Sequence, residues 1–107
     1  LPYYLLVSFI LMEINMAFLC INPKVAMIRL RAGEGLEELT GEFYLNLDKV
    51  IEIRMKPVRA EHDGDFCADV LIILQDKTHE FVFRNSTAGN KAKQTLAGYL
   101  AEQSINC

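Results

Sequence analysis

Alternating apolar and polar positions mark several strands along this chain, and a helical spacing replaces them near its end. Strand patterns run over Lys24–Arg31, Phe43–Leu47, Ile51–Met55, Cys67–Leu74 and His79–Arg84. A period of two is typical of a strand with one face towards the core, whereas apolar residues three or four positions apart are typical of a helix. The change of period after Arg84 therefore predicts one long helix packed on a series of strands.

The final helix is predicted to begin after Ser86 or Thr87, because the side-chain oxygen of either residue can accept a free backbone N–H of the first turn. One side of this helix carries Ala88, Ala92, Leu96, Tyr99, Leu100 and Gln103. The stripe is narrow and begins with alanines, so the first half of the helix is expected to lie close to the sheet. Gly89 and Gly98 should each weaken the helix by about 1 kcal/mol relative to alanine. Docking on the sheet must then stabilise it.

These elements predict an α+β fold, with an antiparallel, strongly bent sheet or partial barrel of about five to six strands closed by one C-terminal helix. The expected core consists of Phe43, Leu45, Ile51, Ile53, Val70, Ile72, Phe81, Phe83, Leu96 and Leu100. The Cys67–Leu74 strand is apolar at nearly every position, so both of its faces should be covered. Residues 1–107 are expected to form a single domain, since this length supports one core.

An apolar N-terminal segment, residues 1–15, precedes the predicted strands. From Tyr3 to Met12 every residue except Ser8 is apolar, and Glu13 follows. As a membrane span the segment would place Glu13 near mid-depth, where an ionisable side chain costs roughly 2.5 to 3.5 kcal/mol. No basic residue precedes Lys24, which disfavours a signal peptide. We therefore do not expect a membrane-bound protein.

The origin of the N-terminal segment leaves two interpretations open. Either it is native, or Leu1 to Leu11 is upstream or cloning-derived sequence and Met12 or Met16 is the natural start. A native segment of this kind has to be covered by the domain or by a second copy, since soluble proteins seldom expose large apolar patches. We therefore expect self-association through this segment, most simply as a homodimer.

Composition and charge exclude some classes of protein. The chain is 51% hydrophobic and 23% charged, with a formal net charge of -3, which places it outside the disordered classes. A mildly acidic balance disfavours a nucleic-acid partner. Cys20, Cys67 and Cys107 are an odd set with no CxxC spacing, which predicts a reduced, cytoplasmic protein.

Candidate chemistry is sparse, and we predict no catalytic residue, no metal site and no cofactor. The densest group of metal-type ligands is Glu61, His62, Asp63, Asp65 and Cys67, and it lacks a framework to fix their geometry. Cys67 and His62 could form a nucleophilic pair, but no oxyanion-hole motif accompanies them. An exposed basic sheet face is a further hypothesis, built from Arg29, Arg31, Arg54, Lys56 and Arg59. Nearby glutamates would repel phosphates from it.

Two thirds of the chain resemble a known kind of domain. The path through residues 43–55, 68–74 and 80–84 and the helix from residue 88 is similar to the second half of small bacterial pleckstrin-homology-like domains, and Leu47–Ile53 resembles a strand start common there. The chain is also similar to small strand-rich proteins with a terminal helix among flagellar regulators and mobile gene cassettes. The resemblance implies a scaffold that binds lipids, peptides or other proteins, with no catalytic apparatus.

Two functions follow as hypotheses. The first is a small non-enzymatic binding or assembly module that acts as a homodimer, because the apolar surface exceeds what one helix can cover. The alternative is a small-molecule-binding protein or enzyme with a pocket between sheet and helix. Tyr44, Met55, His79 and Tyr99 are the candidate lining residues of such a pocket, since amphipathic and polarizable side chains suit pocket walls.

Overall fold

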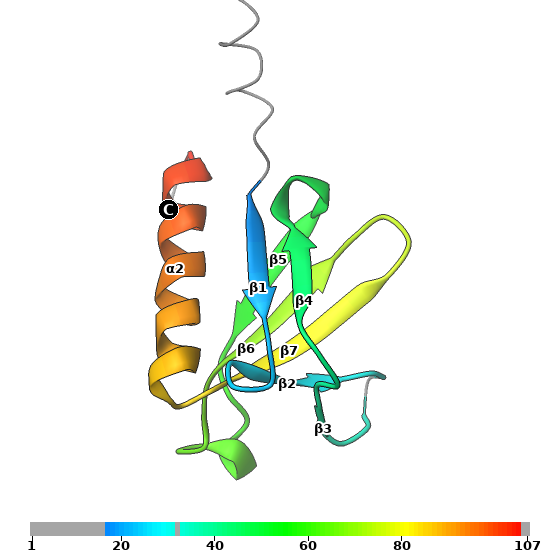
Figure 1. The fold of residues 1–107 in the computed structure, drawn as a ribbon, viewed down its shortest axis with the longest axis vertical. Coiled ribbons are helices and arrows are strands. Elements are labelled where there is room, and N and C mark those ends of the chain that lie inside the picture. Colours follow the sequence, from blue (N-terminus) through cyan, green and yellow to red (C-terminus); the bar gives the residue numbers. More distant parts are fainter. Residues whose placement is uncertain (1–16, 32, 106–107) are drawn as a thin grey trace, which may run out of the picture.

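Two antiparallel sheets and one helix make up the part of the chain that the computed structural model describes, residues 17–31 and 33–105 (Figure 1). The five-stranded sheet has the order β3 (Glu37–Glu38), β2 (Ala26–Arg29), β7 (Thr78–Arg84), β6 (Phe66–Ile73), β5 (Glu52–Lys56). The two-stranded sheet pairs β1 (Phe18–Ile21) with β4 (Phe43–Asn46). Two short 3-10 helices, η1 (Leu47–Lys49) and η2 (Ala60–His62), flank β5, and α2 (Thr87–Gln103) ends the fold. The α+β class and the C-terminal helix are confirmed.

The expected strongly bent sheet or partial barrel is wrong, because the five-stranded sheet is open. Its edge strands are the two-residue β3 on one side and β5 on the other, and they do not meet. The chain changes sheet at η1, where the Asn46 side chain accepts a hydrogen bond from the backbone N–H of Asp48 at 3.0 Å. This turn places β4 in the small sheet and β5 in the large one, although the alternation of residues 43–55 continues across it.

The core lies between the inner faces of the two sheets and α2. Its buried members include Leu19, Ile21 and Leu45 from the small sheet, Val70, Ile72, Phe81 and Phe83 from the large sheet, and Leu96 from the helix. Of the other expected core residues, Phe43, Ile53 and Leu100 are half-buried against this cluster. Ile51 is a wrong prediction, with 68% of its surface exposed. It lies in the bend before β5, so it does not share the inward face of Ile53.

The start of α2 is fixed by a cap and by a close backbone contact. Ser86 Oγ accepts a hydrogen bond from the Gly89 N–H at 3.1 Å, which confirms the predicted cap. A Cβ atom added to Gly89 would lie 1.9 Å from the backbone oxygen of Arg84. Glycine is therefore required for the helix to approach the end of β7 this closely. The sequence interpretation treated Gly89 only as a weak point of the helix.

The two faces of β6 differ in what covers them. Val70 and Ile72 point into the core and are fully buried, whereas Leu71 and Ile73 on the other face are half-buried. Asp69, also on that other face, is only 4% exposed. The expectation that the strand is covered on both sides therefore holds for its core face and in part for the other.

Candidate functional site

A groove lies between strand β1 and helix α2, with a volume of about 340 Å³. Figure 1 shows β1 between α2 and β4, so the edge of β1 that does not pair with β4 faces this groove. Its lining is Phe18, Leu19, Cys20, Val25, Ala88, Lys91, Ala92 and Thr95. Six of these eight side chains are apolar, and Lys91 supplies the one charge. We call this feature the β1–α2 groove.

The sequence creates this groove through small side chains on the helix. Ala88 and Ala92 face β1 across it, and larger residues at these positions would fill the space. The helix itself packs on β6 and β7 through the fully buried Leu96. Strand β1 therefore lies beside the helix without closing the space between them.

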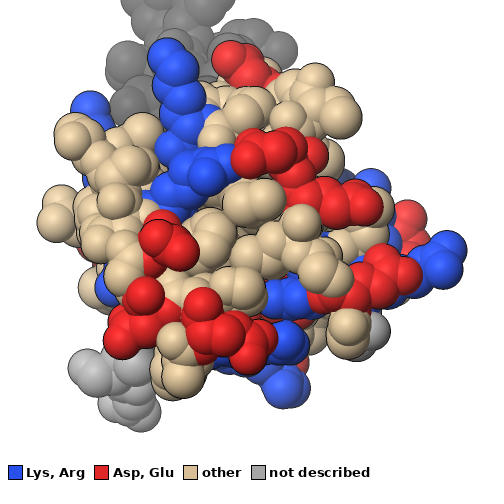
Figure 2. All heavy atoms as spheres, turned by 90° about the horizontal axis from the view of Figure 1, so that it is seen from below, with Lys and Arg blue, Asp and Glu red and all other residues tan. Residues whose placement is uncertain are grey.

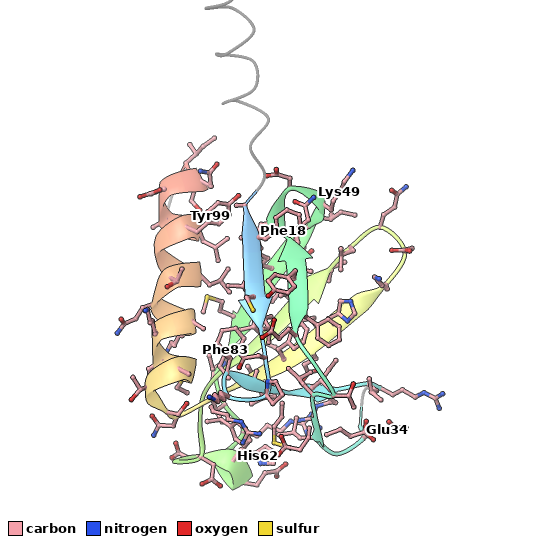
Figure 3. All side chains as sticks on the ribbon, viewed as in Figure 1. Phe18, Glu34, Lys49, His62, Phe83 and Tyr99 are labelled. Atoms are coloured by element: carbon pink, nitrogen blue, oxygen red, sulfur yellow. The ribbon has the colours of Figure 1, made fainter. Side chains whose placement is uncertain are left out.

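The outer face of the small sheet is apolar and exposed. Leu19 and Leu45 form a buried cross-strand pair, so the alternating positions Phe18, Cys20 and Tyr44 point outwards. Phe18 is 54% exposed and Tyr44 is 64% exposed. Figure 3 shows Phe18 on β1, at the side of the molecule where the helix and the small sheet lie next to each other. The outer face thus continues the apolar lining of the β1–α2 groove through Phe18 and Cys20.

Tyr44 contacts a carboxylate at the edge of this outer face. Its hydroxyl donates a hydrogen bond to Glu42 Oε2 at 2.6 Å. This hydrogen bond and the negative charge of Glu42 raise the pKa of Tyr44 to about 12. The phenol is a polar end on this surface, and its hydrogen bond brings the negative charge of Glu42 to the edge of the apolar face.

A second hollow, of about 430 Å³, lies between the C-terminal half of α2 and the β5 region. Its lining is Leu47, Val50, Ile51, Glu52, Ile53, Tyr99, Leu100, Gln103 and Ser104. Tyr99 extends from α2 towards the sheets (Figure 3). We call this space the Tyr99 hollow, and it lies where the sequence predicted a pocket between sheet and helix.

The four candidate ligand-binding residues lie on four different elements. Tyr99 lines the Tyr99 hollow, Tyr44 lies on β4 and Met55 lies on β5, 39% exposed. His79 on β7 packs against the rings of Phe43 and Phe81, with ring centroids 5.9 and 5.7 Å away. Of the four, Tyr99 is the member of the hollow's lining, so the structure does not gather them around it.

The face of the five-stranded sheet that points away from the helix carries a charge cluster of Arg29, Asp69 and Glu80, which are largely buried, and Lys56, whose side chain is 42% exposed. Arg29 Nε lies 3.0 Å from Glu80 Oε2, and Lys56 Nζ lies 4.0 Å from Glu80 Oε1. Arg29 and Asp69 are only 5% and 4% exposed. The register places Arg29 directly opposite Glu80 and Lys56 directly opposite Asp69. Opposite charges thus meet across adjacent strands.

Burial raises the pKa of the Asp69 carboxyl, and the negative charge of Glu80 raises it further. A protonated carboxyl beside an ionised one is a pattern known from acid and base chemistry. A hollow of about 200 Å³ nearby is lined by Arg29, Leu30, Leu71, Thr78 and Glu80. Asp69 is not among these residues, and its Oδ1 is buried. The raised pKa is therefore best explained by a structural charge cluster.

The cluster corrects one sequence hypothesis. Arg29 was expected on an exposed basic face, but it is buried and paired with Glu80. Arg54, by contrast, is exposed and pairs with Glu52 on its own strand. The signal that could have identified the cluster is the cross-strand register, which periodicity alone does not supply.

The loop that carried the densest metal-type ligands contains no assembled site. Among residues 17–31 and 33–105, no three His, Cys, Asp or Glu side chains come together in a way that could hold a metal ion. His62 packs against the ring of Phe66, with the ring centroids 5.6 Å apart. Cys67 Sγ donates to the Arg84 carbonyl oxygen at 3.4 Å, and burial raises the pKa of its thiol. A raised pKa disfavours the thiolate that a nucleophile needs.

Charges of both signs are interspersed over the face seen from below (Figure 2). Arg84 Nη2 and Glu38 Oε2, for example, lie 2.6 Å apart. Within the described parts of the chain, no helix is long and apolar enough to cross a membrane.

Comparison of the chain with family models, with curated proteins and with solved structures gave no match. The case for a function therefore rests on the surfaces described above.

Proposed function

We propose that this chain is a small non-enzymatic binding or assembly module that acts as a homodimer. The observation that supports this is the exposed surface of the two-stranded sheet, whose strand residues are uncharged, next to the apolar β1–α2 groove. Strands β1 and β4 have the sequences FLCI and FYLN, without a charged residue. A contiguous apolar surface of this kind is typical of a protein–protein interaction site.

The edges of the large sheet support the same proposal by contrast. Strand β3 consists of Glu37 and Glu38, and β5 carries Glu52, Arg54 and Lys56. Charged residues on edge strands prevent unwanted pairing with other chains. The strands of the small sheet have no such charged residues, which favours the proposal that a partner covers this sheet.

The test is the mass of the full chain in solution. Light scattering coupled to size exclusion, over a range of protein concentrations, should give twice the mass of one chain. A mass of one chain at every concentration would contradict the homodimer. High salt should not dissociate the dimer, because burial of apolar surface is not screened by ions.

We further propose that the N-terminal segment, Leu1 to Met12, adds to the interface. These residues lie outside the described part of the chain. Burial of each large apolar side chain stabilises by roughly 1.5 to 3 kcal/mol. A chain that begins at Met16 should therefore become monomeric, or aggregate through uncovered partner surface. An unchanged mass and melting temperature would show that the segment is an appendage.

A second candidate function is binding of a small molecule in the Tyr99 hollow. Its position between helix and sheet favours this, as does the combination of apolar Val50 and Ile53 with polar Glu52 and Gln103. A library of small aromatic and aliphatic compounds, screened by NMR chemical shifts, is the test. Binding that moves signals of residues around the hollow, and is lost in Tyr99→Ala, would support this function over the first. Shifts that persist in Tyr99→Ala would argue against it.

A further inference from the structure

The edge of β1 that does not pair with β4 borders the β1–α2 groove (Figure 1). We infer that this edge binds an extended peptide segment of another protein, which adds to the small sheet as an antiparallel strand. The segment carries apolar side chains and one carboxylate, which meets Lys91. The inference rests on the proposed binding module, since it names the class of partner, but it does not require the homodimer.

The backbone of β1 directs hydrogen-bonding groups towards this edge. The N–H of Leu47 donates to the carbonyl oxygen of Ala17 at 2.9 Å, in register with the β1–β4 pairs. Backbone groups alternate between the two edges of a strand, so Ala17 faces β4, whereas Phe18 and Cys20 point their N–H and C=O groups to the other edge. In the described parts of the chain these groups of Phe18 and Cys20 have no backbone partner. Such an edge is a template for pairing with an extended chain.

The groove provides space for the side chains of an added strand. Its volume of about 340 Å³ lies within the range of pockets that bind ligands. Ala88 and Ala92 line it on the helix, and the buried Leu19 lines it on β1. Side chains on one face of the added strand would meet this apolar lining, and those on the other face would point outwards, as Phe18 does.

Lys91 makes a carboxylate the complementary charge for the segment. It is exposed on α2 and is the one charged residue in the lining of the groove. No carboxylate in the parts of the chain that the structure describes forms an ion pair with its ammonium group. Glu42 lies outside the lining and accepts a hydrogen bond from Tyr44 on β4, so it would repel a carboxylate placed over β4. The acidic side chain of the segment therefore belongs on the α2 side of β1.

A designed peptide tests this assignment. The peptide is short and terminally blocked, valine alternates with threonine in it, and one central threonine position holds glutamate. Its addition should shift the NMR signals of the Phe18 and Cys20 backbone amides and slow their hydrogen exchange. A peptide with lysine in place of the glutamate should bind about three- to tenfold more weakly, because it places a like charge beside Lys91. Equal binding of the two peptides, or no binding of the glutamate peptide, would overturn the inference.

Methylation of the peptide backbone tests strand pairing. Residues directly opposite each other in an antiparallel pair have side chains on the same face, so the outward-facing threonines and glutamate should bond to Phe18 and Cys20. N-methylation of these residues should weaken binding more than about tenfold, since it removes the donors. N-methylation of the valines instead is the matched control and should weaken binding less than about threefold. Equal losses in the two methylated peptides would rule out the added strand.

Charge reversal on the protein tests where the carboxylate binds. Lys91→Glu should reverse the preference, so that the lysine peptide binds more tightly than the glutamate peptide. Lys49→Glu makes the same change of net charge at an exposed residue outside the groove lining (Figure 3), and it should keep the wild-type preference. A preference that Lys91→Glu does not change would contradict the contact. Circular dichroism checks that both variants fold.

Light scattering with and without the glutamate peptide separates this inference from the proposed homodimer. A dimer that does not bind the peptide would overturn the inference and leave the homodimer intact. A monomer that binds it would support the inference and contradict the homodimer. If dilution of the chain alone speeds hydrogen exchange at Phe18 and Cys20, a second copy covers the edge, and the inference is overturned.

Discussion

The two sheets of this protein differ in the residues that they carry at exposed positions. The five-stranded sheet places charged residues on its edges and pairs buried charges on its outer face, as Arg29 with Glu80. The two-stranded sheet has no charge at all, and it exposes Phe18 and Tyr44. Since short two-stranded sheets are marginal in water, the small sheet depends on its packing against the large one. Both sheets supply core residues, such as Ile21 and Phe83, whereas the exposed aromatic side chains of the two sheets' strands, Phe18 and Tyr44, lie on the small sheet.

The largest expected effect is in the part of the core built by the large sheet. Phe83→Ala removes a fully buried ring from β7 and should lower the free energy of unfolding by about 3 to 5 kcal/mol. Chemical denaturation monitored by circular dichroism measures this. Ile51→Ala, at a position 68% exposed, is the control and should change stability by less than about 0.5 kcal/mol. Equal losses in the two variants would show that Phe83 does not pack in the core as the structure places it.

The next effect concerns the junction between the large sheet and α2. Gly89→Ala would place a Cβ atom 1.9 Å from the Arg84 backbone oxygen, so the helix would have to move away from β7. We expect a loss of about 1 to 3 kcal/mol, the usual range for an over-packed core. Gly98→Ala is the matched control in the same helix, with no atom within 4 Å of the added Cβ. It should stabilise the protein by about 0.5 to 1 kcal/mol. The same sign for both substitutions would show that Gly89 does not set the contact.

These effects also show which parts of the structure the sequence could predict. Hydrophobic period identified strands β2 and β4 to β7 and the extent of α2, and the hydroxyl of Ser86 identified the cap, because local chemistry determines these features. It did not identify β1 or the two-residue β3. It missed the change of sheet at η1, since the alternation of residues 43–55 keeps its phase across the turn. The barrel prediction failed for this reason.

The candidate site was harder to predict than the fold. The pairing of Arg29 with Glu80 depends on strand register, and the β1–α2 groove depends on how far α2 lies from β1. Neither the strand register nor the distance between α2 and β1 can be predicted from the hydrophobic period of a single segment. Ala88 and Ala92 were interpreted as signs of close packing, and they do sit near the Gly89 contact. On the side that faces β1, however, their small side chains leave a groove.

A smaller effect should come from the charge cluster on the outer face of the large sheet. Burial and Glu80 raise the pKa of Asp69, so the carboxyl binds its proton more tightly in the folded state than in the unfolded chain. The stabilisation is complete below the unfolded pKa, near 3.9, and is lost as the pH rises through the raised folded pKa. Asp69→Asn cannot lose a proton there. Its stability relative to the wild type should therefore increase with pH.

Thermal unfolding of both proteins, from about pH 4 upwards, measures this difference. Asp65→Asn, on an exposed loop, is the control and should change stability by less than about 0.5 kcal/mol. A difference between Asp69→Asn and the wild type that stays constant over the whole pH range would show that the cluster does not bind a proton in the proposed way.

The smallest effect lies where the two sheets meet. His79 of the large sheet packs against Phe43 of the small one, and burial and the charge of Lys77 lower the pKa of His79. A base with a lowered pKa contributes stability above its unfolded pKa, near 6.5, and this contribution is lost as the pH falls through the folded value. Acidification below about pH 6.5 should therefore destabilise the wild type more than His79→Gln.

The free energy of unfolding of both proteins, measured by chemical denaturation at matched pH values, tests this prediction. The NMR signals of Tyr44 report separately on the small sheet. If acid loosens the Tyr44 region first, the small sheet is the weaker of the two. If both regions unfold together at every pH, the two sheets form one cooperative unit.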